Sequence, residues 1–400
     1  MSTASVSTRR RWTMLAVGVL AQASAAITIH GPAFLIPTLR RDDGLTLVEA
    51  SLVAAAPTVG VMLALVAWGY LADRAGERLV LVAGLAGTAL AGCVATRLDD
   101  VVALGLVLVV AGMFAASTAS ASGRLVVGWF PAQRRGLAMG IRQMAQPVGV
   151  GIAAISIAVL AERYGVGTAL VVPAAAAAVA TVLVALLVID PPRPARSAAA
   201  TPNPYRHDFL WRIHGVSVLL VIPQFAVWTF GLVWLVDSRG WAPGPAGTLV
   251  ALSQVAGALG RIAVGQLSDM VGSRTRPLLW VACGAGACMA LLGLTDALDL
   301  SVAVVLLVVA TTVTVADNGL AFTAVAEYAG PFWSGRALGV QNTGQYLTAA
   351  ACAPVVGAAI AHGGYALGFA LTALGPLVAL PLVPREPRPP ATTDRVPEPL

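Results

Sequence analysis

The sequence predicts an all-α integral membrane protein in which twelve transmembrane helices form two pseudo-symmetric six-helix bundles. Three observations predict this fold class. The 400 residues are 58% hydrophobic and only 11% charged, whereas soluble domains carry about 25% charged residues. Uncharged stretches long enough to cross a bilayer recur along the chain, for example Val101–Gly123 and Gly339–His362. In addition, a short charged motif occurs twice, about half the chain length apart.

Twelve apolar segments account for most of the chain. Each is continuously apolar, which is typical of a membrane-spanning helix, whereas the strands of a membrane β-barrel alternate between apolar and polar residues. Seven of the nine Trp residues lie near the ends of these segments, where an aromatic belt is expected at the membrane interfaces. The expected spans are residues 13–36, 50–71, 79–96, 101–126, 136–160, 166–189, 213–236, 244–268, 277–294, 300–325, 337–360 and 364–383.

The start of the chain has a second interpretation. The segment TRRRWTMLAVGVLAQASAA resembles a twin-arginine signal peptide with small residues at a cleavage site near Ala23–Ala25. The apolar run, however, continues to Ile36, which exceeds the usual hydrophobic length of a signal. We therefore expect an uncleaved first helix.

The distribution of charge predicts the orientation in the membrane. All 25 basic residues are Arg. With the N-terminus inside, the inner segments carry 17 Arg and 9 acidic residues, and the outer loops carry 5 Arg and 9 acidic residues. This excess of Arg predicts a multi-pass protein of the plasma (inner) membrane with both termini in the cytoplasm. Because topology accounts for the net charge of +6, the expected partner is the lipid bilayer and not nucleic acid. We expect a monomer.

The sequence gives no support for a cofactor, a metal or an enzymatic activity. All four Cys residues lie in apolar spans, where free Cys behaves as a small hydrophobic residue, and the four His residues are scattered. Neither a Gly-rich phosphate-binding loop nor a pairing of nucleophile and base is visible. We therefore expect no metal, no cofactor and no catalytic residue.

The chain divides into two halves of six spans each. The N-terminal half comprises residues 1–189, a linker rich in Pro, Ala and Arg follows at 190–210, and the C-terminal half comprises residues 211–383. The linker is expected to be flexible and cytoplasmic. The proline-rich segment 384–400 is expected to be a disordered cytoplasmic tail.

A charged motif repeats between the two halves. GYLADRAGER at residues 69–78 is echoed by GQLSDMVGSR at residues 265–274, with five of ten positions identical. A second pair of segments, RRGLAMGIRQMAQ at 134–146 and WSGRALGVQNTGQ at 333–345, has nearly the same offset. Both copies of the charged motif follow the second span of their half, so they are expected on the same, cytoplasmic face. Tandem parallel repeats of this kind are typical of secondary transporters.

On these motifs, the chain resembles the major facilitator superfamily (MFS) over nearly its full length. GYLADRAGER is similar to the superfamily's signature between helices two and three. We expect Asp73 to lie against the positive N-terminal end of a helix of the other half. The resemblance implies that the motif holds the cytoplasmic side closed when the carrier faces outward. The alternative is that these residues only anchor a short inside loop. In the second copy Met270 replaces a commonly basic residue, so we expect a weaker electrostatic role there. The residues expected to form this conformational gate are Gly69, Asp73, Arg74, Gly76, Arg78, Gly265, Asp269, Gly272 and Arg274.

A further segment carries a weaker resemblance. GIRQMAQPVGVG at residues 140–151 is similar to the fifth-helix signature of drug–proton antiporters. Gln146 stands where that signature has Gly before Pro147, and Val150 replaces one of its paired glycines. These departures weaken the resemblance to an efflux carrier without removing it.

Polar residues within the spans predict a central cavity, because charges are costly in lipid and usually face one. Arg142 lies about six residues into the fifth expected span, and Gln146 lies one turn deeper on the same face. The repeat places Gln341 and Gln345 opposite them, with Tyr346 adjacent. Arg142 would then bind an anion or pair with a charge. The alternative is an Arg that snorkels to the inner interface.

One acidic residue, Asp317, is expected inside a span, with Asn318 beside it and Arg261 at a comparable depth. A carboxylate in a low dielectric suits a proton-coupling group, because its ionisation changes as a cavity opens. The alternative is a permanent Arg–Asp pair between packed helices. Further candidates for binding substrate or protons are His30, Gln224 and Trp228.

The resemblance implies a secondary carrier that moves a small organic solute by alternating access, with protons as the expected coupling ion. Arg142 and Arg261 favour an organic anion as the solute. A drug–proton antiporter is the alternative, based on the fifth-helix segment. A membrane receptor that kept the fold but lost transport is a third hypothesis.

Overall fold

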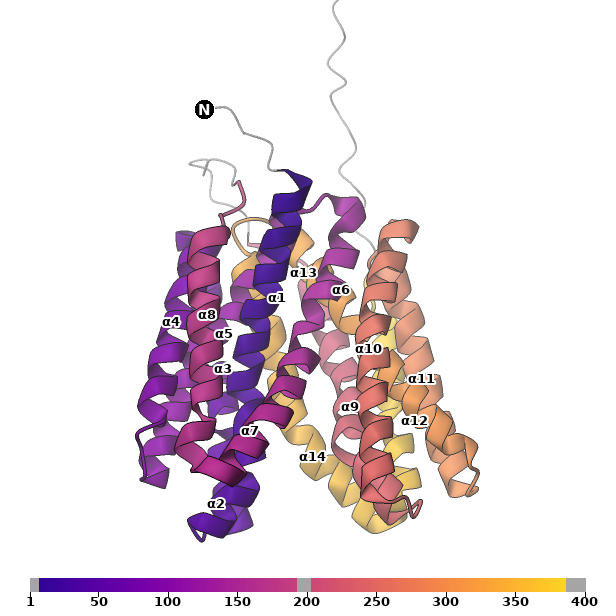
Figure 1. The fold of residues 1–400 in the computed structure, drawn as a ribbon. Helices are drawn as coiled ribbons and strands as arrows, with labels where there is room; N and C mark the ends of the chain where they lie inside the picture. The colour runs from indigo at the N-terminus through magenta and orange to yellow at the C-terminus, as the bar shows by residue number, and fades with distance from the viewer. Residues whose placement is uncertain (1–6, 193–202, 386–400) are drawn as a thin grey trace, which may run out of the picture.

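Helices form all of the regular structure in the computed structural model, which describes residues 7–192 and 203–385. They are arranged as two bundles that stand side by side (Figure 1). The predicted fold class, an all-α membrane protein with two six-helix bundles, is confirmed.

Each bundle is built from one half of the chain. The N-terminal bundle contains α1 (Thr8–His30), η1 (Gly31–Leu35), α2 (Ile36–Asp42), α3 (Leu47–Ala75), α4 (Glu77–Ala95), α5 (Val101–Trp129), η2 (Ala132–Arg134), α6 (Arg135–Gln143), α7 (Ala145–Ala169) and α8 (Val171–Leu187). The C-terminal bundle contains η3 (Pro204–Arg206), α9 (Asp208–Asp237), α10 (Pro243–Val271), α11 (Thr275–Ala297), α12 (Val302–Val313), α13 (Asp317–Ala329), α14 (Ser334–Thr372), α15 (Leu374–Ala379) and η4 (Leu380–Leu382).

The apolar helices make twelve membrane crossings. Ten helical stretches within the described ranges are long and apolar enough to span a bilayer. One of them, Ser334–Leu382, turns back at Gly363 and Gly364 and therefore supplies two crossings (Figure 1). A similar turn at Gly165 leads into the shorter apolar helix Val171–Leu187, which completes the twelve predicted spans.

Two motif glycines end helices in a backbone conformation that other residues rarely adopt. Gly76, between α3 and α4, has a φ of 105°, and Gly272, after α10, has a φ of 65°. A side chain would strain the backbone at these values, so glycine permits both tight turns. Both turns lie at the same end of the molecule (Figure 1), which we call the motif end (residues 75–77 and 271–275).

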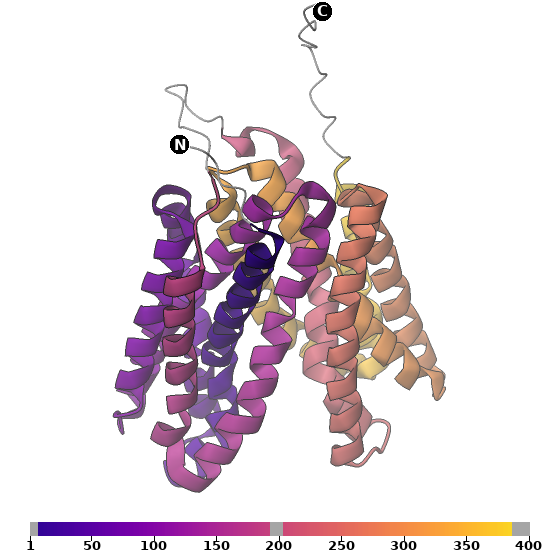
Figure 2. The same cartoon turned by 45° about the horizontal axis from the view of Figure 1, so that its top comes forward.

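The two bundles pack together at the motif end, and their ribbons diverge toward the opposite end (Figures 1 and 2). Across the interface, α3 and α5 contact α14, and α6 contacts α10 and α13. A buried apolar cluster near this end contains residues of both halves, among them Met139, Leu320 and Leu338. The sequence repeat therefore corresponds to two bundles that meet through equivalent helices.

Parts of the expected linker and tail lie outside the described residues, namely 193–202 and 386–400. At the end of the expected linker, α9 already begins at Asp208, three residues before the expected start of the C-terminal half. The cytoplasmic location of the motif end stays a prediction from the Arg bias.

Candidate functional site

Asp73 lies at the motif end and binds the first turn of a helix from the other half. Its buried carboxylate accepts hydrogen bonds from the backbone N–H groups of Gly335 (2.8 Å) and Arg336 (3.1 Å), at the start of α14. The Arg336 side chain adds an ion pair, with Nε 2.9 Å from a carboxylate oxygen. The first N–H groups of a helix lack partners within it and mark the positive end of its dipole, so a carboxylate stabilises this contact.

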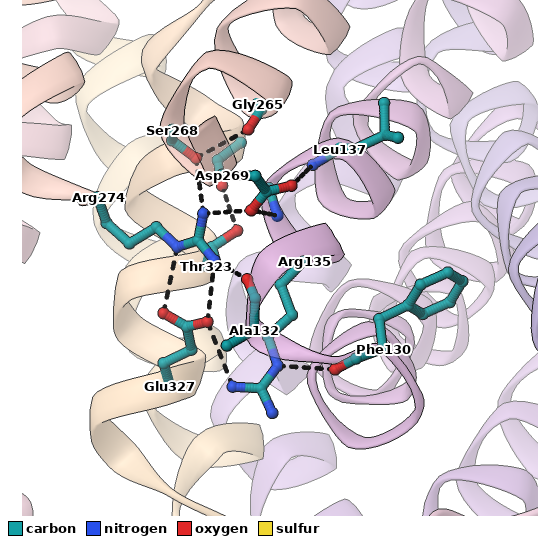
Figure 3. A network of polar contacts seen from close by, with 12 residues as sticks. Phe130, Ala132, Arg135, Leu137, Gly265, Ser268, Asp269, Arg274, Thr323 and Glu327 are labelled. Atoms are coloured by element: carbon teal, nitrogen blue, oxygen red, sulfur yellow. Dashed lines mark hydrogen bonds and ion pairs between the residues drawn. The ribbon is translucent and has the colours of Figure 1, made fainter. Parts of the chain in front are cut away.

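The second copy of the motif makes the same kind of contact in the opposite direction (Figure 3). Asp269, from the C-terminal half, accepts hydrogen bonds from the backbone N–H groups of Gly136 and Leu137, both at 2.9 Å. These two residues lie in the first turn of α6, in the N-terminal half. Each half therefore supplies one carboxylate to the start of a helix in the other half.

Arg274 lies between two carboxylates in Figure 3. Its guanidinium is 2.6 Å from Asp269 and 3.3 Å from Glu327, and Arg135 of the other half approaches Glu327 to 3.3 Å. Burial lowers the pKa of Arg274, but the hydrogen bonds and charges of the two carboxylates outweigh burial and leave that pKa raised. Met270 is exposed. The structure thus differs from the expectation of a weaker second copy, because Asp269 has two backbone bonds and an ion pair without a basic residue at position 270.

Glycines allow the two halves to approach closely at these contacts. A Cβ on Gly69 would collide with the carbonyl of Gly335, and a Cβ on Gly265 would collide with the carbonyl of Gly136. The two pairs occupy repeat-related positions. Such an approach of one backbone to another requires residues without a side chain.

The other basic residues of the first copy contact their own half. Arg74 stacks on Tyr70, with 4.5 Å between the guanidinium carbon and the ring centroid. The backbone N–H of Arg78 donates to Asp190 (2.7 Å), and a Cβ on Gly76 would collide with that carboxylate. These residues therefore shape the turn and do not join the halves.

A polar cavity of about 580 Å³, including its open mouth, lies between the halves. Its wall comes from α1, α6 and α7 of one half and from α9, α13 and α14 of the other. Seven of the lining residues have amide side chains and one is charged. The lining residues are Gln22, Arg142, Gln143, Gln146, Val221, Gln224, Phe225, Asn318, Phe322, Asn342, Gln345 and Tyr346.

Arg142 supplies the charge in the cavity wall. Its side chain is buried, with Nε donating to Ser122 Oγ (2.8 Å), Nη1 to Gln143 Oε1 (2.9 Å) and Nη2 to the Ala119 carbonyl (3.2 Å). Gln22 Oε1 is a more distant acceptor at 3.5 Å. Within the described ranges, all of these partners are neutral. The guanidinium is held between helices, so the alternative of an Arg that snorkels to the interface is wrong.

A chain of amide side chains forms the facing wall in the C-terminal half. Asn318, on α13, donates to Gln224 Oε1 on α9 (3.0 Å). Gln345, on α14, donates to Asn318 Oδ1 (2.8 Å) and to Ser217 Oγ on α9 (2.6 Å). These hydrogen bonds connect the three helices at the cavity. Each side chain in the chain of bonds still has capacity for a further hydrogen bond.

Asp317 and Arg261 lie beside the cavity and do not line it. Asp317 is buried at the first position of α13, and neither carboxylate oxygen has a hydrogen-bond partner of normal geometry among the described residues. It interacts electrostatically with Arg261. Arg261 donates to the backbone carbonyls of Val315 (3.2 Å) and, across the interface, Gln143 (2.7 Å). Arg261 therefore bonds to backbone carbonyls and does not form a direct ion pair with Asp317, which was the alternative prediction.

Gln341 also lies outside the cavity wall, contrary to the prediction. It is buried, and its Oε1 contacts Nδ1 of His214. The hydroxyl of Tyr205 lies 3.0 Å from the other ring nitrogen of His214. Burial raises the pKa of Tyr205 to about 12, so this hydroxyl stays neutral.

The remaining candidates contribute less. His30 lies 3.5 Å from the amide of Gln146 but is not part of the cavity wall. Trp228 packs on an apolar cluster. In the part of the chain that the structure describes, no group of three or more His, Cys, Asp or Glu side chains is placed to hold a metal ion.

Several contributing residues are not among the sequence candidates, and five of them show what the sequence did and did not indicate. Gln22, Gln143 and Asn342 line the cavity, and each was visible as a polar residue within an apolar span. Arg336 lies in the second repeated segment, which indicated a structural role for that stretch. Glu327 carries no comparable signal, since it stands near a span end like an ordinary interfacial acid.

Two bundles related by a sequence repeat, with reciprocal contacts at one end and a polar cavity between them, are typical of a secondary membrane transporter. The model of the Major Facilitator Superfamily matches residues 16–351, and the chain belongs to this superfamily.

Curated relatives align with much of the chain. An uncharacterized MFS-type transporter of Mycobacterium tuberculosis is 46% identical over 389 residues, covering 96% of this chain and 87% of the relative. A probable sulfoacetate transporter of Cupriavidus necator is 27% identical and covers 86% of this chain and 87% of its own. The glycerol-3-phosphate transporter of Bacillus subtilis is 25% identical over 65% of each chain.

Solved structures share the fold at low sequence identity. The fucose:proton symporter of Escherichia coli has a TM-score of 0.73 at 15% identity, covering 92% of this chain and 97% of its own. The human organic anion transporter MFSD10 has a TM-score of 0.72 at 18% identity, covering 94% of this chain and 99% of its own.

Proposed function

We propose that this MFS transporter carries a small organic anion. The observation that supports the proposal is the charge of the cavity: Arg142 is the charged residue of its wall, and neutral groups accept its hydrogen bonds. In a low dielectric, such a positive charge attracts an anion and disfavours a cation. The names of two relatives, transporters of glycerol-3-phosphate and of sulfoacetate, agree with an anionic substrate.

Transport would proceed by rocking of the two halves around the cavity, and the motif residues would form the gate. The hydrogen bonds of Asp73 and Asp269 join the halves at the motif end, which is therefore closed in this structure. If that end faces the cytoplasm of a plasma-membrane protein, as the Arg bias favours, the cavity is open to the outside.

Asp317 is the proposed proton-coupling group. Its buried carboxylate has no hydrogen bond of normal geometry to a described residue, and it interacts electrostatically with Arg261, so its protonation would remove a negative charge beside that guanidinium. Arg261 in turn donates to the Gln143 carbonyl across the interface (2.7 Å), next to the cavity. Protonation of Asp317 would change the electrostatic balance on a side chain that connects the halves, and would thereby shift the equilibrium between the two states of the carrier.

Uptake of labelled organic anions into proteoliposomes tests the substrate class. Arg142→Gln should lower uptake at low substrate concentration about tenfold to a hundredfold, because a hydrogen bond to a charged group contributes about 1.5–3 kcal/mol. Arg163→Gln makes the same change of charge at an exposed position and should leave uptake unchanged. If no anion moves while a lipophilic cation is extruded, the drug–proton antiporter is favoured. Ligand binding without any flux would favour a receptor.

An imposed pH gradient tests the coupling. Anion accumulation should follow the gradient and disappear with a protonophore. Asp317→Asn should abolish gradient-driven accumulation but retain exchange of labelled for unlabelled anion, because exchange needs no net proton movement. Loss of exchange as well would indicate that Asp317 is structural. Accumulation by the unmodified protein that ignores the gradient would contradict proton coupling.

A further inference from the structure

The hydrogen bonds of Arg142 determine which atoms two neighbouring amides present to the cavity. Guanidinium nitrogens can only donate. Arg142 therefore engages the carbonyl oxygen of Gln143 (2.9 Å) and points toward that of Gln22 (3.5 Å). The side-chain NH₂ groups of both amides are left for the cavity, since no described residue accepts from them. This wall thus offers N–H donors beside a positive charge, an arrangement that binds oxyanions.

The facing wall presents acceptors together with a donor. Asn342 donates from Nδ2 to the Leu338 carbonyl (2.8 Å), which can only accept, so Asn342 keeps Oδ1 for the cavity. Gln345 donates from Nε2 to Asn318 and keeps Oε1. At the other end of the same chain of bonds, Gln224 accepts from Asn318 and keeps its NH₂ group. This wall carries no charge. It offers acceptors for the hydrogen that a hydroxyl donates and a donor for the oxygen of the same hydroxyl.

We infer that the substrate is a hydroxy acid with a single negative charge, such as an α-hydroxy or polyhydroxy carboxylate. This inference rests on the proposed transport of an organic anion. The oxyanion binds the amide donors of Gln22 and Gln143 beside Arg142, and a hydroxyl binds the acceptors of Asn342 and Gln345. A hydroxyl both donates and accepts, and so it also suits the amide donor of that wall, whereas an ammonium group only donates.

A molecule held in this way contacts both halves of the carrier. The donors for its oxyanion lie on α1 and α6, and the acceptors for its hydroxyl lie on α14. An analogue without the hydroxyl leaves amide groups of the site without a partner, which is how a site built for a hydroxyl rejects such an analogue. A second carboxylate would meet acceptor oxygens, so dianions are disfavoured.

Matched pairs of acids test the inference with the full-length protein in proteoliposomes. Initial uptake of radiolabelled glycerate is compared with that of propionate, and gluconate is compared with hexanoate, at equal concentration and after subtraction of the uptake by protein-free liposomes. At least one hydroxy acid should enter about tenfold faster than its partner, the effect of about one hydrogen bond. Unlabelled serine, which carries an ammonium group, and glycerol, which carries no charge, should compete poorly.

A pair of variants on α14 tests the assignment of the hydroxyl site. Asn342→Leu should bring the uptake ratio of hydroxy acid to deoxy acid close to one. Thr343→Val is the control, because the Thr343 hydroxyl donates to the Gly339 carbonyl and does not line the cavity. The control should keep the full ratio.

Two results would overturn the inference while the proposed transport of anions stands. One is equal or faster uptake of the deoxy acid in both pairs, and the other is an unchanged ratio in the Asn342→Leu variant. Uptake of none of the four acids, while another labelled organic anion enters, would also overturn the inference alone. If no organic anion enters, the proposed function fails together with the inference.

Discussion

Replacing Asp73 by Asn should open the motif end of the carrier. The carboxylate makes three contacts with the start of α14: the N–H groups of Gly335 (2.8 Å) and Arg336 (3.1 Å), and Arg336 Nε (2.9 Å). An amide keeps one acceptor oxygen, so one backbone bond and the ion pair are lost. Each such bond contributes about 1.5–3 kcal/mol, but Arg336 is partly exposed and regains water. The closed state should therefore lose about 2–3 kcal/mol, a shift of about 30- to 150-fold.

Thiol labelling measures this shift. The four native Cys residues are first replaced, and Leu338→Cys then places a thiol at a buried site that faces Gly123 of the other half. This thiol should react only when the halves separate at the motif end, so its labelling rate reports the open fraction. Asp208→Asn makes the same change of charge at an exposed position and serves as the control. A labelling rate in Asp73→Asn equal to that of the control would refute the reasoning.

Two further variants test other contacts of the fold. Gly265→Ala should raise labelling of the same thiol, because its Cβ collides with the carbonyl of Gly136, whereas Gly247→Ala on the same helix meets nothing within 4 Å and should not. Glu77→Gln should lower stability by about 3–5 kcal/mol, because it removes the charge that faces the buried guanidinium of Arg124 at 2.9 Å. An unchanged melting temperature of the detergent-solubilised protein would contradict that expectation.

The fold was predictable because hydropathy and a sequence repeat act over long stretches of chain. Twelve apolar runs and the offset between the two motif copies are enough to give the two bundles and their shared face. The helix ends were less predictable, since a helix continues past the apolar segment as long as its terminus is capped. The second expected span, 50–71, is in fact Leu47–Ala75, with a capping box between Thr46 and Glu49.

The site was only partly predictable because a sequence gives the depth of a residue along a helix better than its direction around it. The sequence repeat placed Gln341 and Gln345 opposite Arg142 and Gln146, at a matching depth. Packing then turns Gln345 and Asn342 into the cavity and directs Gln341 to His214. The sequence likewise did not identify which helix Asp73 and Asp269 bind. In both cases the binding helix begins in a copy of the second repeated segment.

The contact of Asp73 with α14 and the contact of Asp269 with α6 are related by the repeat. Their contributions to the free energy of the closed state should therefore add in a single transition. If the bundles rock as rigid bodies, as proposed, the contacts of Asp73 with α14 and of Asp269 with α6 break in the same step. Labelling of Leu338→Cys should then respond to Asp269→Asn as well, although the thiol lies on α14, and the double variant should show the product of the two single effects while the open state is the minor one. If the contact of Asp73 and the contact of Asp269 opened independently, Asp269→Asn would leave this thiol protected, and the double variant would label no faster than Asp73→Asn alone.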